Sequence, residues 1–130
     1  MVDMNVLSFR PISAEILVHR LGGAGIENLR LKLKEQTLVP PGISVFQATD
    51  PEVIQTQIRQ AFPNATRLIA DAKTIATATV DAIRQAGFEV MPNPTRHFPN
   101  HARLIHSNGL LGFSDDHLAE LSKAFSTTRS

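Results

Sequence analysis

The sequence predicts a single α+β domain, residues 1–130, with a mostly antiparallel sheet of about four to six strands and about three helices. The chain length of 130 residues suits one hydrophobic core. With 42% hydrophobic and 19% charged residues, the composition is that of a folded domain. Strand patterns also come in groups instead of alternating with helices, which favours an antiparallel sheet covered on one face by helices.

Four strands are predicted in the N-terminal part of the chain. Apolar and β-branched residues bounded by turn formers predict strands at 5–12 and 14–23. In segment 29–34, three leucines alternate with basic residues, which predicts a half-exposed strand with a basic outer face. A one-sided helix of the same residues fits this alternation less well. The fourth strand is predicted at 42–48, after two prolines.

Two helices are expected next. Asp50 is a suitable N-cap, and Pro51 suits the first helical position. The buried stripe of this helix is predicted to consist of Val53, Ile54, Ile58, Ala61 and Phe62. A second helix is predicted from about residue 65 or 71 to 86, because apolar residues recur there at helical spacing. Gly87 is placed to end it as a left-handed C-cap.

The C-terminal part of the chain is predicted to contain three strands and a helix. Residues 88–92 form a short strand, and the prolines that follow predict a loop. Residues 101–113 are predicted as a β-hairpin that turns at Asn108-Gly109. Ser114 is the expected N-cap of the last helix, and the tail 126–130 is expected to fray.

Composition restricts the possible functions. A net charge of +1 provides no general attraction for nucleic acid or for an anionic membrane, so any phosphate binding must be local. The absence of cysteine excludes disulfides, thiol nucleophiles and cysteine-ligated zinc. The N-terminus lacks the pattern of a signal peptide, and no apolar run approaches the roughly 20 residues that span a bilayer. We therefore expect a soluble, cytoplasmic protein without a membrane partner or cofactor.

A cluster of basic residues is the strongest functional signal. Three histidines and two arginines lie within residues 96–106, with no acid among them. If 101–107 is a strand, His101 and Arg103 share one face, and His106 lies on the other. The preceding loop can bring Arg96 or His97 beside His101.

This cluster favours acid–base chemistry on a phosphodiester. One imidazole can remove a proton from a ribose hydroxyl, another can protonate the leaving oxygen, and an arginine can stabilise the phosphorane. The leading hypothesis is metal-independent cleavage of RNA, with His101 as general base or acid and His97 as its partner. Arg103 would stabilise the phosphate charge. Further contacts to the substrate are assigned to Arg96 and Asn100.

Two alternatives to acid–base chemistry exist for the cluster. His97 and His101 have the spacing of a metal pair on a helix, but Pro99 between them argues against a helix, so no metal is predicted. The cluster can also be a solvated basic loop whose ion pairs contribute at most about 1 kcal/mol. In that case the protein is a non-catalytic interaction, accessory or immunity domain, with a protein partner or a second copy of itself. Whether the protein is an enzyme stays open.

A second candidate site comes from the segments "ILVHRLGG" and "PPGISVF". This pair resembles ADP-ribosyltransferase-type domains, including the RNA 2′-phosphotransferase branch. The resemblance implies that His19, Arg20 and Ser44 hold a nicotinamide dinucleotide or the phosphate of the substrate. The catalytic glutamate of many members has no clear match here. The simpler interpretation is two core strands, with His19 half-buried and Ser44 hydrogen-bonded.

Overall fold

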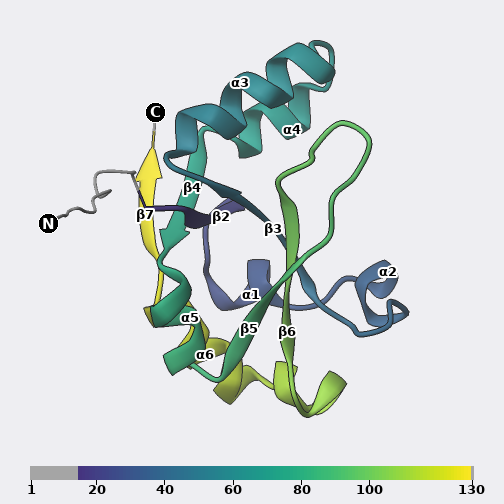
Figure 1. The fold of residues 1–130 in the computed structure, drawn as a ribbon, viewed down its shortest axis with the longest axis vertical. Helices are drawn as coiled ribbons and strands as arrows, with labels where there is room; N and C mark the ends of the chain where they lie inside the picture. Colours follow the sequence, from purple (N-terminus) through teal and green to yellow (C-terminus); the bar gives the residue numbers. More distant parts are fainter. Residues whose placement is uncertain (1–14, 130) are drawn as a thin grey trace, which may run out of the picture.

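The computed structural model describes residues 15–129, which form one six-stranded sheet with helices packed on it (Figure 1). The strand order is β5-β6-β3-β2-β4-β7, and each neighbouring pair is antiparallel. This confirms the α+β class and the antiparallel sheet. The strand predicted at 5–12 lies outside the described residues.

The strands are β2 (Leu17–Leu21), β3 (Ile43–Ala48), β4 (Thr74–Ala78), β5 (Phe88–Pro92), β6 (His101–His106) and β7 (Ser126–Arg129). The helices are α1 (Ile26–Leu29), α2 (Leu33–Gln36), α3 (Pro51–Ala61), α4 (Thr66–Asp71), α5 (Val80–Gln85) and α6 (Asp115–Lys123), with a 3-10 helix, η1, at Gly109–Phe113. The described part of the chain thus has six α-helices, twice the number that the sequence predicts.

Where local capping chemistry is strong, the predicted elements are confirmed. The Asp50 carboxylate accepts hydrogen bonds from the backbone N–H groups of Glu52 and Val53 at the start of α3. The Ser114 hydroxyl accepts the backbone N–H of His117 at the start of α6. Gly87 has a φ of +93°, a left-handed conformation that costs glycine little after a helix.

The strand predicted at 29–34 is wrong. The segment contains the end of α1 and the start of α2 instead. Glu35 is the reason, because its carboxylate accepts the backbone N–H of Lys32 across the first turn of α2 and is itself nearly buried. Leu29 is fully buried, whereas Leu33 is 82% exposed, so the leucines do not share one face of a strand.

The single helix predicted for 65–86 is also wrong. The structure places α4, β4 and α5 in that stretch. Thr74, Ile75 and Thr77 are β-branched and favour a strand, and β4 pairs on both sides, with β2 and β7. The Thr79 hydroxyl then accepts the backbone N–H of Ala82 and starts α5.

One further prediction fails near the C-terminus. Asn108-Gly109 is not the turn of a β-hairpin. Strand β6 pairs instead with β5, to which the 93–100 loop connects it, and residues 109–113 form η1. Gly112 permits this arrangement, since any Cβ at that position would overlap the His106 ring. Residues 126–129 form β7, which pairs with β4.

Helices cover both faces of the sheet, not one as expected. On the first face, strand residues such as Val18, Val45 and Leu104 form a core with residues of α1, α5 and α6. On the second face, Phe46, Ala48 and Ile75 form a smaller core with α3 and α4, which lie side by side in Figure 1. Over residues 15–129, no helix has the length and apolarity needed to cross a membrane.

Candidate functional site

Strand pairing brings Ser44 and His101 together, although 57 positions separate them in the sequence. In the antiparallel β3–β6 pair, Ser44 lies opposite Arg103 and Phe46 lies opposite His101. Residues opposite one another, and residues two apart on a strand, share a face of the sheet. Ser44, His101 and Arg103 therefore all project from the second face.

The His101 ring is held at both nitrogens. Nδ1 lies 2.8 Å from the carbonyl oxygen of Asn93, and Nε2 lies 2.6 Å from the hydroxyl oxygen of Ser44. Because a carbonyl oxygen only accepts, Nδ1 carries the proton. In the neutral ring Nε2 is then an acceptor, and the Ser44 hydroxyl donates to it. The arrangement of the Ser44 hydroxyl, the His101 ring and the Asn93 carbonyl is that of a nucleophile, its base and a group that orients the base.

Two buried charged side chains fix the backbone of Ser44. Pairing between β2 and β3 ends at His19 and Phe46, so the polar groups of Ser44 lack a β2 partner. The Glu35 carboxylate accepts the Ser44 N–H at 3.1 Å, and Arg20 Nη1 donates to the Ser44 carbonyl at 2.8 Å. Burial lowers the pKa of Arg20, whereas the charges of Glu35 and Asp71 act in the opposite direction. The strand position of Ser44 is thus strongly constrained.

Arg103 contributes a buried positive charge on the same face. Its side chain is 8% exposed, and Nη1 donates to the Pro40 carbonyl at 2.7 Å. Within the described residues its Nε–H is buried and has no hydrogen-bond partner, and no carboxylate pairs with the guanidinium. A buried donor without a partner costs roughly 1–3 kcal/mol. Arg20 Nε is buried without a partner in the same way, so this feature alone does not distinguish a functional arginine from a structural one.

The 93–100 loop folds over this part of the sheet through aromatic contacts. Phe98 packs edge-on against Phe46 with ring centroids 5.1 Å apart, and Phe46 contacts the His101 ring at 5.4 Å. Asn100 Nδ2 donates to the Gln57 side chain at 3.0 Å and ties the loop to α3. The loop thereby holds the Asn93 carbonyl against His101.

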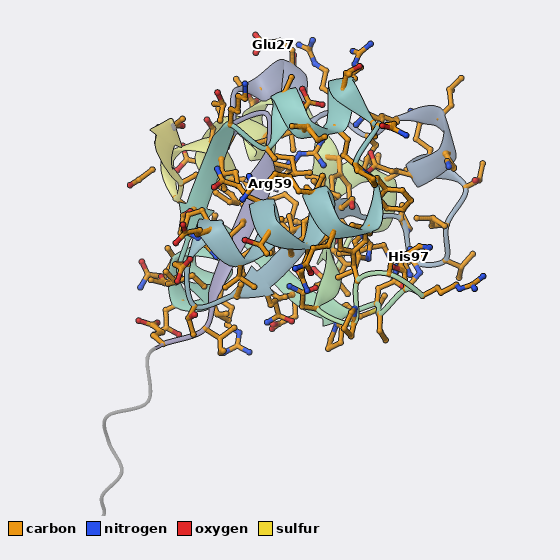
Figure 2. All side chains as sticks on the ribbon, turned by 90° about the horizontal axis from the view of Figure 1, so that it is seen from above. Glu27, Arg59 and His97 are labelled. Carbon is orange, nitrogen blue, oxygen red and sulfur yellow. The ribbon has the colours of Figure 1, made fainter. Side chains whose placement is uncertain are left out.

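Three residues of the predicted cluster do not join Ser44 and His101. His97 is exposed, and its ring packs on Phe62 with centroids 5.0 Å apart (Figure 2). Arg96 is exposed on the same loop. His106 lies at the far end of β6, where its ring contacts His117 and Phe88. The structure thus brings together His101 and Arg103 and leaves His97 at the surface.

The second candidate site is divided by the sheet. His19 and Arg20 are neighbours on β2, so their side chains leave opposite faces. His19 is fully buried; its Nε2 donates to the Ala48 carbonyl at 3.0 Å, and its Nδ1 lies 2.9 Å from the Thr77 hydroxyl. Burial lowers the pKa of His19, while the bond to Ala48 and the charge of Asp50 raise it. His19 is therefore a core residue. Of this second set, Ser44 contributes its side chain to the site described above, and Arg20 only holds the Ser44 carbonyl.

Two features of the site escaped the sequence analysis. Asn93 contributes only a backbone carbonyl, for which a sequence carries no signal. The contact between the Glu35 carboxylate and the Ser44 N–H was not predicted, because the residues before Glu35 were predicted to form a strand. Among residues 15–129, no group of three or more histidine and acidic side chains is placed to hold a metal ion.

Comparison with known proteins identifies no relative: no family model matches the chain, and no curated protein or solved structure is significantly similar to it.

Proposed function

We propose that this protein is a metal-independent enzyme that cleaves phosphodiesters, with RNA as its first candidate substrate. Ser44 and His101 are the catalytic pair. The observation that supports the proposal is the 2.6 Å contact between Ser44 Oγ and His101 Nε2, in a ring whose Nδ1 is bound to the Asn93 carbonyl. A serine hydroxyl next to an oriented imidazole is a group that can be activated as a nucleophile near neutral pH.

In the proposed reaction, Ser44 Oγ attacks phosphorus and transfers its proton to His101 Nε2. The bond between phosphorus and the leaving sugar oxygen breaks, and the imidazolium gives its proton to that oxygen. Water then attacks the phosphoserine, His101 accepts the proton of the water, and the proton returns to Ser44 as the Ser44–phosphorus bond breaks. The Asn93 carbonyl stabilises the imidazolium through Nδ1–H in both steps.

Arginines supply the positive charge that this reaction needs. Arg103 lies opposite Ser44 on the same face, and a guanidinium is well suited to phosphate oxygens. Its guanidinium would stabilise the negative charge that develops on the phosphate. Arg96, exposed on the loop that covers His101, would contact the next phosphate of the chain. Asn100 would keep that loop in place through its bond to Gln57.

The test uses two labelled oligonucleotides of one sequence, an RNA and its DNA counterpart, each with and without EDTA. We expect cleavage that EDTA does not reduce. Ser44→Ala and His101→Gln should each lower the rate by a factor of about 100 or more. The matched control is His97→Gln, which removes an exposed imidazole from the same loop and should retain most of the activity.

The products distinguish the roles of the two residues. Cleavage of both RNA and DNA, with a trapped phosphoserine, supports Ser44 as the nucleophile. Cleavage of RNA alone with a 2′,3′-cyclic phosphate product would mean that His101 acts on the ribose hydroxyl and Ser44 only positions it. Intact oligonucleotides under all conditions would refute the proposed function.

One observation favours a second candidate, a protein-interaction domain. Leu33, Val39 and Leu111 are each at least 80% exposed, and Leu110 is 54% exposed. Leu110 also lines a groove with Leu31, Gln36 and Phe113 between the α1–α2 segment and η1. Exposed apolar residues of this size often mark a contact with another protein. Light scattering of the wild type and of Leu111→Ser tests self-association, and a monomer at every concentration would argue against it.

A further inference from the structure

A pocket of about 280 Å³ lies between α3 and α4, away from Ser44 and His101. It is partly enclosed, and six residues line it: Gln55, Ile58, Arg59, Ile69, Ala72 and Lys73. Gln55 Nε2 donates to the Ala72 carbonyl at 2.7 Å, which ties α3 to the residue that ends α4. The wall of the pocket is therefore held by a contact between the two helices.

The floor of the pocket is apolar. Ile58 is fully buried, Ala72 is nearly so, and both belong to the core that α3 and α4 form on the second face of the sheet. Ile69 is half-buried and packs against the same core. An apolar ring or short chain can be removed from water against these side chains.

The rim of the pocket carries two positive charges and no acid. Arg59 projects from α3 on the side of α4 (Figure 2), and Lys73 follows α4 directly. In the part of the chain that the structure describes, neither side chain makes an ion pair or a hydrogen bond. Asp71, the nearest acid in sequence, lines a different hollow, and its charge acts on Arg20. The electrostatic potential at the rim is therefore positive.

We propose that this pocket binds a small organic anion, a carboxylate or phosphate joined to one apolar ring or short chain. Ile58, Ile69 and Ala72 receive the apolar part, and Arg59 and Lys73 hold the acid group. The volume lies just below the usual range of roughly 300–1,000 Å³ for ligand sites, so it suits one ring and its acid group. Because the lining shares no residue with the Ser44–His101 site, this proposal does not depend on the proposed enzyme activity.

NMR titrations of the full chain test the proposal. The measured quantity is the chemical shift of the backbone amides of residues 55–59 and 69–73. The probes are benzoate, phenyl phosphate, benzyl alcohol and inorganic phosphate. We expect benzoate or phenyl phosphate to move these amides with a Kd in the range of about 0.1–10 mM. Benzyl alcohol lacks the charge and inorganic phosphate lacks the ring, so both should bind more weakly. The relative affinities of benzoate and phenyl phosphate identify the preferred acid group.

Variants test each part of the pocket separately. Arg59→Gln and Lys73→Gln should each weaken binding of the better anion by about three-fold, as expected for an exposed charge. The matched control is Arg67→Gln, which removes an exposed α4 cation that does not line this pocket and should leave Kd nearly unchanged. Ile69→Ser should weaken phenyl phosphate but not inorganic phosphate.

Three results would overturn the proposal. Amides that do not move at about 10 mM of either aromatic anion would show that the pocket is not a binding site of useful affinity. Benzyl alcohol binding as tightly as benzoate would remove the role of the charged rim. Equal effects of Arg67→Gln and Arg59→Gln would indicate attraction to the whole surface and no defined site.

Discussion

His19 should make the stability of the fold depend on pH. The ring is fully buried, with both nitrogens engaged by Ala48 and Thr77, and burial lowers its pKa. The folded protein thus binds the proton less readily than the unfolded chain, whose histidine titrates near 6.5. The stabilisation is fully present above that pH and decreases as pH falls below it. The slope approaches about 1.4 kcal/mol per pH unit for one such group.

Urea denaturation of the wild type and of His19→Gln, at pH values from about 5.5 to 8, measures this effect. Glutamine offers a donor and an acceptor but does not titrate. We expect His19→Gln to cost about 1–3 kcal/mol at pH 8, because at least one buried hydrogen bond is imperfectly replaced. The difference between the two proteins should shrink by about 1 kcal/mol per pH unit below 6.5. His106, whose pKa is also lowered, contributes equally to both curves. A difference that is constant with pH would refute the argument for a buried neutral His19.

Other substitutions follow from single contacts. Asp50→Ala removes the N-cap of α3 and should cost about 1 kcal/mol in urea unfolding, whereas the exposed Thr49→Ala, one residue earlier, should cost much less. Gly112→Ala places a Cβ on His106 and should cost about 1–3 kcal/mol; the cost should fall in a His106→Gly background, which removes both the ring and the Cβ of residue 106, and an equal cost in both would contradict the contact. Arg103→Met should leave the urea midpoint unchanged or raise it, because a buried unpaired charge is removed, while oligonucleotide cleavage is lost; retained cleavage would exclude Arg103 from the site.

Helix ends were the part of the fold that local sequence predicts best. Asp50 and Ser114 accept backbone N–H groups within three residues of themselves, and Gly87 adopts its conformation because it lacks a side chain. These interactions need no distant partner, so their residue types identify them. The same is true of β3, which is short, apolar and bounded by turn formers.

Segments whose state depends on distant partners were predicted wrongly. The apolar residues of 65–86 suit a helix by spacing, but β4 forms there because β2 and β7 offer hydrogen-bonding edges on both sides. The leucines of 29–34 alternate like a strand, but Glu35 closes a helical turn and also binds the Ser44 N–H of a different element. In the first case strand pairing outweighs the local helical preference. In the second, a local capping bond that also has a tertiary partner outweighs the strand-like alternation.

The candidate site shows the same division. The sequence by itself determined the chemical inventory: a chain without cysteine, a basic cluster at 96–106, and the shared face of His101 and Arg103 on one strand. Only the tertiary structure decided that Ser44, from the other candidate set, is the partner of His101, and that His97 and His19 are not. The reason is the register of β3 against β6. It is determined by the packing of both faces of the sheet, and a shift of one residue would turn Ser44 away from His101.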